Sequence, residues 1–150
     1  MAASTTTSQS LYIIYNADST MLGKLSYVKR KVTCPDPNES PACAACELTH
    51  GPSLSLKESS DWVKTRARID GVAVQQVHRD EMPIELKTWT RENKVPSPSV
   101  VVSVAGEGGF RELLTREDLA RVRKNHEDFL QLLETRAGEE KVVNLTIKNP

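Results

Sequence analysis

The sequence has little that would place it in a membrane or on nucleic acid. No apolar run approaches the roughly 20 residues that a membrane-spanning helix needs, and the opening residues MAASTTTSQS lack the basic and then apolar order of a secretory signal. The 20 Lys and Arg residues are balanced by 20 Asp and Glu residues, so the chain lacks the positive field with which proteins bind phosphates. We therefore expect a cytoplasmic protein with no membrane and no nucleic-acid partner.

The sequence also lacks the common signatures of hydrolases and kinases. It contains no Gly-x-Ser-x-Gly, no His-Glu-x-x-His and no phosphate-binding loop. The glycine-rich stretch 106–109 precedes an expected strand rather than a helix, so it predicts a turn. Cysteine is scarce, and the odd count of 3 argues for thiols or metal ligands rather than a disulfide framework.

What is present is typical of one globular α/β domain. A chain of 150 residues that is 38% hydrophobic can bury a core without disulfide or metal staples. Residues 1–10 are small and polar and are expected to form a flexible tail. Residues 11–138 are expected to form the domain, and residues 139–150 an edge strand or a second tail.

The pattern of apolar residues predicts the order strand, helix, loop, helix, three strands and helix. Leu11 to Tyr15 is almost wholly apolar, which predicts a strand buried on both faces. Further strands are expected at 72–77, 99–105 and 110–114. A first helix is expected after the turn at 16–19, and a second from 55 to 69 with Leu56, Val63 and Ala67 facing inward. The segment 82–94 is expected to be a weak helix or irregular. The last helix is expected to run from a cap at Thr115, where Asp118 completes a capping box, to Gly138.

The region 33–52 interrupts these elements with prolines and contains all three cysteines. Cys43-x-x-Cys46, followed by His50, has the spacing of a zinc half-site, which Cys34 or His78 would complete. The same pair can instead cycle between dithiol and disulfide. The pattern is therefore compatible with three interpretations, in which the cysteines are redox-active, bind a metal or are inert.

Polar residues follow or precede three of the expected strands at what should be one edge of the sheet. Asn16 and Asp18 leave the first strand, His78 and Asp80 leave the second, and Pro98 leads into the third. Placed between Asp80 or Glu81 and a thiolate, His78 could orient a base or bind a metal through one nitrogen. The alternative is that Asp18 only caps a helix and that the acidic residues after His78 are solvated; His126 is expected to be a satisfied core histidine.

Two resemblances accompany this pattern. Pro98 before Val100-Val101-Val102, the glycine hairpin and Thr115-Arg116-Glu117-Asp118-Leu119 resemble the thioredoxin-like fold, which implies a three-layer α/β sandwich with a small mixed sheet and a cis Ser97–Pro98 bond. The motifs Tyr15-Asn16-Ala17-Asp18-Ser19, Cys43-Ala44-Ala45-Cys46-Glu47-Leu48-Thr49-His50-Gly51 and His78-Arg79-Asp80-Glu81 are similar to those of a family of small uncharacterised proteins. In thioredoxins the Cys-x-x-Cys follows the first strand, whereas here residues 16–19 stand at that place.

These features predict a small thioredoxin-like protein with a thiol–disulfide redox role. Cys43 would be the attacking thiol and Cys46 the resolving one, with a protein thiol or a small-molecule thiol as partner. The alternative is a binding module stabilised by zinc on Cys43, Cys46 and His50, and a third possibility is a scaffold without chemistry.

Overall fold

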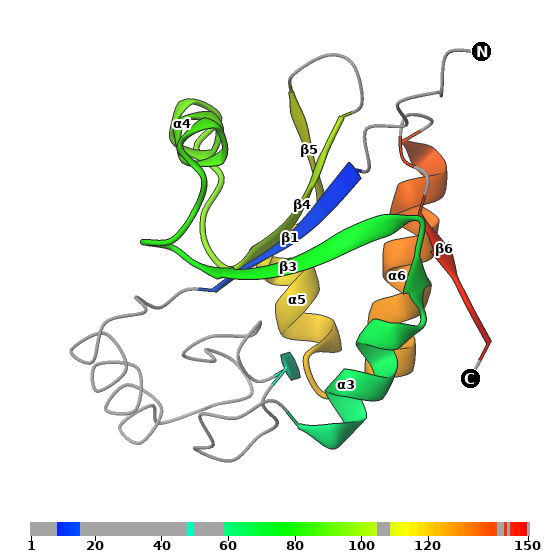
Figure 1. The fold of residues 1–150 in the computed structure, drawn as a ribbon. Helices are drawn as coiled ribbons and strands as arrows, with labels where there is room; N and C mark the ends of the chain where they lie inside the picture. The colour runs from blue at the N-terminus through cyan, green and yellow to red at the C-terminus, as the bar shows by residue number, and fades with distance from the viewer. Residues whose placement is uncertain are drawn as a thin grey trace, which may run out of the picture.

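The computed structural model describes residues 9–15, 48–49, 59–104, 109–140, 143 and 145–149. This part of the chain is a mixed α/β unit with four helices and a mixed sheet. No helix within it is long and apolar enough to cross a membrane. Its elements, in chain order, are β1 (Gln9–Tyr15), α3 (Ser60–Ala67), β2 (Ile69–Asp70), β3 (Val72–His78), α4 (Ile84–Glu92), β4 (Ser99–Ser103), β5 (Phe110–Leu114), α5 (Arg116–Val122), α6 (His126–Glu139) and β6 (Thr146–Ile147) (Figure 1).

The main sheet has the strand order β3-β1-β4-β5. β1 pairs parallel with β3 along its whole length and antiparallel with β4, and β4 pairs antiparallel with β5. These pairings confirm that the first two strands are parallel neighbours and that the last two form a hairpin. The segment near the carboxyl end forms β6, which pairs with β2 in a separate two-stranded sheet rather than at an edge of the main one.

β1 lies in the interior of the sheet and is buried on both faces, as its apolar run predicts. Successive side chains of a strand point to opposite faces. Leu11, Ile13 and Tyr15 accordingly belong to the core beneath α3, α5 and α6, whereas Ile14 packs with the residues beneath α4. Figure 1 shows the same division, with α4 on one side of the sheet and the other three helices on the opposite side.

β1 begins two residues earlier than its apolar run indicates. Gln9 and Ser10, assigned to the tail from their polarity, belong to the strand. The Gln9 amide donates to the Ser103 carbonyl at 2.9 Å, and the Ser10 N–H donates to the Ser103 hydroxyl at 2.9 Å. Gln9 and Ser10 also continue the parallel pairing of β1 with β3, opposite Val72 and Ala73, so pairing on both sides extends the strand. Residues 1–8 and the helix expected after the turn at 16–19 lie outside the described residues.

The helix expected at 55–69 is shorter and faces the core differently. Ser59 caps α3 by accepting a hydrogen bond from the Trp62 N–H at 3.1 Å, and Ile69 already belongs to β2. Val63 is 45% exposed, and Ala67 is exposed too, so the prediction that they point inward was wrong. Trp62 is fully buried instead, because its large ring packs edge-on against Phe129 with centroids 5.6 Å apart. Leu56 lies outside the described residues.

The single helix expected at 115–138 is two helices. The capping box at Thr115 is confirmed: the Asp118 N–H donates to the Thr115 hydroxyl at 3.1 Å and the Thr115 N–H to the Asp118 carboxylate at 3.0 Å. The chain then breaks at Asn125, whose side chain accepts from the Asp128 N–H at 3.1 Å and starts α6. An asparagine at this position favours a new helix start over helix continuation. Gly138 does not end α6, which continues to Glu139.

A carboxylate cluster joins β5, α5 and α6. The Asp118 side chain is 5% exposed and accepts hydrogen bonds from Arg136 at 3.0 and 3.3 Å and from Arg121. Burial opposes its ionisation, but the bonds with Thr115 and Arg121 and the charge of Arg136 prevail and lower the pKa of Asp118. The pKa of Glu112 is raised instead, by burial and by the negative charges of Asp118 and Glu117. Hydrogen bonds and positive charges thus stabilise the ionised form of Asp118, whereas the surroundings of Glu112 disfavour its ionised form.

Candidate functional site

The carboxyl ends of β1 and β3 and the start of β4 lie at one edge of the sheet. Tyr15 and His78 are register partners at the ends of their strands, and Ile14 is opposite Ser99. Pro98 directly precedes Ser99, is buried, and follows a cis peptide bond from Ser97, as the resemblance implied. The structure therefore brings the backbone positions of His78 and Pro98 to the same edge.

Several predicted site residues lie outside the described residues. They are Asn16, Asp18, Cys34, Cys43, Cys46 and His50. Within the described ranges, no group of three or more histidine, cysteine, aspartate or glutamate side chains is arranged to hold a metal ion. Asp80 is described, and it is exposed in the turn that follows β3.

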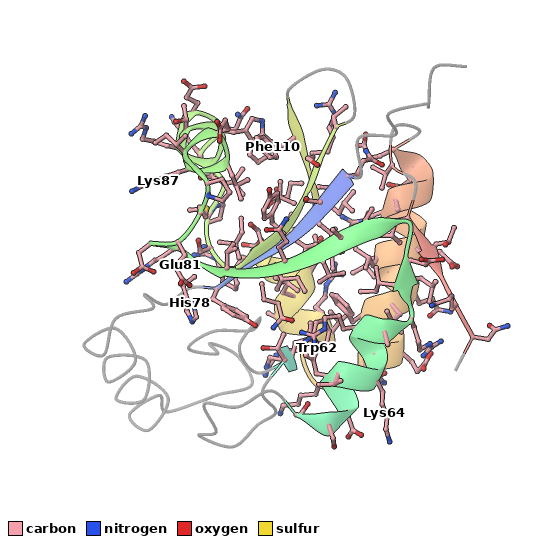
Figure 2. The ribbon with its side chains drawn as sticks, viewed as in Figure 1. Trp62, Lys64, His78, Glu81, Lys87 and Phe110 are labelled. Atoms are coloured by element: carbon pink, nitrogen blue, oxygen red, sulfur yellow. The ribbon has the colours of Figure 1, made fainter. Side chains whose placement is uncertain are left out.

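His78 and Glu81 form a close polar pair at the end of β3. The Nδ1 atom of His78 lies 2.5 Å from the Oε1 atom of Glu81, and the same oxygen lies 3.4 Å from the His78 backbone nitrogen. Figure 2 shows the two side chains together beyond the strand end. The Tyr15 ring packs against the imidazole ring, with the two centroids 5.1 Å apart and the ring planes at 59°. A carboxylate on Nδ1 orients the ring and leaves Nε2 as its second functional atom.

The Tyr15 hydroxyl is the centre of a partly buried hydrogen-bond network beneath this edge. The Gln76 amide donates to it at 2.6 Å, and it donates to the Thr49 hydroxyl at 3.1 Å. The Gln76 carbonyl oxygen accepts from the Trp62 indole N–H at 3.1 Å and from the Arg66 guanidinium. The network therefore ties the ends of β1 and β3 to α3.

Leu48 and Thr49 are fixed beneath the same edge. Both are fully buried, and the Leu48 carbonyl oxygen lies 2.8 Å from the Nε2 atom of His126. Because a carbonyl can only accept, His126 donates from Nε2, and its Nδ1 atom lies 2.9 Å from the Thr65 hydroxyl. The Thr49 carbonyl accepts from the Ser59 N–H at 2.9 Å. His126 is thus satisfied at both nitrogens, as expected.

Sequence reasoning found the strand ends but missed this network. The apolar pattern predicts Tyr15 and Gln76 only as strand residues, and it indicates no role for Trp62. The available signal was Gln75-Gln76 inside the otherwise apolar strand Val72–His78. A glutamine that faces the core needs buried partners, so its alternating position could have indicated the polar network.

Comparisons with known proteins did not assign this chain to a family. A scan against protein-family models found no match, and searches of curated proteins and of solved structures found no significant match.

Proposed function

We propose that this chain is a thioredoxin-like protein that exchanges thiols and disulfides through Cys43 and Cys46. The observation that carries the proposal is the anchoring of Leu48 and Thr49, which are fully buried beside the last residue of β1. Cys43 and Cys46 precede Leu48 in the sequence by five and two residues, and the proposal takes the Cys-x-x-Cys pair to act at the edge where Tyr15 and His78 meet.

The strand order and the element order support the thioredoxin-like assignment. A βαβ unit in which β1 and β3 are parallel precedes the β4-β5 hairpin and a closing helix. Helices cover both faces of the sheet, which gives three layers. Ligands of open α/β sheets bind beyond the carboxyl ends of the parallel strands, the same edge that the proposal uses.

The proposed reaction is a two-step exchange. The Cys43 thiolate attacks a substrate disulfide, which forms a mixed disulfide and releases one substrate thiolate. The Cys46 thiolate then attacks the Cys43 sulfur, which releases the second substrate thiolate and leaves a Cys43–Cys46 disulfide. The substrate gains two electrons and the protein loses two. A protein disulfide or a small-molecule disulfide can serve as substrate.

Replacing Cys43 with serine tests this function. Reduced wild-type protein should cleave a small aromatic disulfide, and Cys43→Ser should abolish that cleavage, because serine cannot form the mixed disulfide. Cys46→Ser should accumulate the mixed disulfide on Cys43, detected by intact-protein mass. Cys34→Ser is the matched control and should exchange normally. If the wild type is inactive and holds stoichiometric zinc that shields Cys43 and Cys46 from alkylation, the zinc-stabilised module with His50 as ligand replaces this proposal.

The His78–Glu81 pair has a proposed role in the same reaction, as the proton acceptor for the attacking thiol. Glu81 holds the Nδ1 side of His78, so Nε2 is the atom that would take the proton. Glu81→Gln keeps a hydrogen-bond acceptor but removes the charge. It should slow thiol attack about tenfold at pH 7, where few ordinary thiols are ionised, and the difference should vanish above the ordinary thiol pKa of about 8.5.

Asp80→Asn is the matched control for the charge, since Asp80 is exposed in the same turn and the carboxylate that contacts the His78 imidazole is that of Glu81. The pH dependence of the single-turnover rate is the measurement. Equal rates for the Glu81 and Asp80 variants at every pH would show that the pair does not assist the thiol.

A further inference from the structure

A groove lies between α4 and β5 on the face of the sheet opposite α3, α5 and α6. It has a volume of about 340 Å³ and is lined by Ile84, Glu85, Thr88, Trp89, Glu92 and Phe110. Residues 85, 88, 89 and 92 are spaced so that they share one stripe of the helix. Figure 2 shows Phe110 on the side of α4 that faces β5, whereas Lys87 points away from the opposite side of the helix.

The floor of the groove is aromatic and fixed in place. The Trp89 and Phe110 rings lie 5.7 Å apart at 51°, and Tyr12 meets Phe110 edge-on at 6.3 Å. Ile84 stands at the end of the groove with 69% of its surface exposed. Phe110 is only 9% exposed and Trp89 is half-buried, so the exposed apolar surface of the groove comes from Ile84 and part of Trp89. Exposed apolar surface beside a packed aromatic floor is a common feature of protein interaction sites.

The charges beside this floor are of one sign. Glu85 and Glu92 are the only charged residues that line the groove, and neither forms an ion pair within the described part of the chain. They lie seven residues apart on α4, which corresponds to about 10.5 Å along a helix. Two backbone positions at that spacing suit two separated cations on one chain better than one compact ammonium group.

We propose that this groove binds a peptide segment of a partner protein in which an apolar side chain is flanked by Lys or Arg residues. The apolar side chain would cover Ile84 and the exposed part of Trp89, and the two cations would pair with Glu85 and Glu92. Anionic lipid is disfavoured as occupant because two carboxylates repel it. The groove is separate from the edge with His78, so this binding does not depend on the proposed redox function.

An array of synthetic ten-residue peptides tests the proposal. Each peptide has one central leucine with Lys or Arg placed two to four residues away on both sides, and a matched array has Glu at those places. The basic peptides should bind and raise the fluorescence polarisation of an attached dye, and the acidic ones should not. Replacing the central leucine with serine should weaken binding about tenfold, because the apolar contact is lost.

Protein variants distinguish binding at the groove from nonspecific attraction to the charge of the protein. Glu85→Gln with Glu92→Gln should weaken the basic peptides about fivefold, since two exposed ion pairs are lost. Glu134→Gln with Glu139→Gln, which makes the same change of charge on α6, should leave binding unchanged. Disulfide cleavage by the Glu85/Glu92 variant should equal that of the wild type, so loss of one activity does not imply loss of the other.

Four results would overturn the proposal. They are no binding by any basic peptide, equal binding by the acidic array, binding that the Glu85/Glu92 change leaves intact, and equal competition by a simple alkylammonium salt. A protein that sediments as a dimer and becomes monomeric in the Glu85/Glu92 variant would assign the groove to a second copy of this chain instead.

Discussion

Replacing Trp62 with alanine is expected to lower the free energy of unfolding by about 3 to 5 kcal/mol. Trp62 is fully buried between α3 and the sheet and packs edge-on against Phe129 and His126. Its removal leaves a cavity in the larger core and takes away the indole donor of Gln76. The measurement is urea unfolding followed by far-ultraviolet circular dichroism.

The neighbouring Val63 provides the control on the same helix. It is 45% exposed, so Val63→Ala should cost no stability and can gain a little from the higher helix propensity of alanine. The loss of unfolding free energy for Trp62→Phe should lie between those of Val63→Ala and Trp62→Ala, because phenylalanine keeps most of the ring but not the N–H group. An equal loss for the Val63 and Trp62 alanine variants would contradict the packing of α3 described above.

The strands were predictable because their signal is local. Leu11 to Tyr15 and Val100 to Val102 are apolar at every position, and such runs predict strands buried on both faces. The two parallel strands and the hairpin then followed from the order of the elements. Gln9 and Ser10 could not be assigned in this way, because they join β1 through pairing with β3 and bonds to Ser103, both far along the chain.

The faces and breaks of the helices were less predictable. Whether Trp62 or Val63 of α3 faces the core depends on where Phe129 lies, which no local pattern states. The break before α6 did have a local signal, because Asn125 is followed by acidic residues in the next turn. The continuous apolar stripe across residues 119–133 concealed that signal.

The candidate site was predictable in its position but not in its contacts. Topology alone placed His78 and Pro98 at one edge of the sheet. The bonds that fix this edge join residues distant in sequence: Tyr15 to Thr49, and His126 to Leu48 across 78 positions. Side-chain pairs at such separations are set by the packed fold, so a single sequence does not predict them.

Replacing Asp118 with asparagine is expected to lower the free energy of unfolding by about 2 to 3 kcal/mol at neutral pH. The substitution keeps an acceptor for the Thr115 N–H but leaves Arg136, whose side chain is 33% exposed, without its negative partner. The figure is below that of a fully buried pair because water reaches Arg136. Arg121→Ala, the control, should cost under about 1 kcal/mol, since the Arg121 side chain is 68% exposed.

The pH dependence of this loss has a definite sign. The pKa of Asp118 is lowered in the folded protein, so its stabilisation is complete above the ordinary value of 3.8 and is lost as the pH falls through the lowered value. The difference between wild type and Asp118→Asn should therefore be constant near neutrality and shrink in acid. Glu112 acts in the opposite direction, because its raised pKa makes the wild type less stable as the pH rises above 4.5. Because the Asp118 charge contributes to the raised pKa of Glu112, both proteins should also carry Glu112→Gln, and urea unfolding from pH 3 to 7 then isolates Asp118. A difference that does not shrink below pH 4 would exclude its charge as the cause.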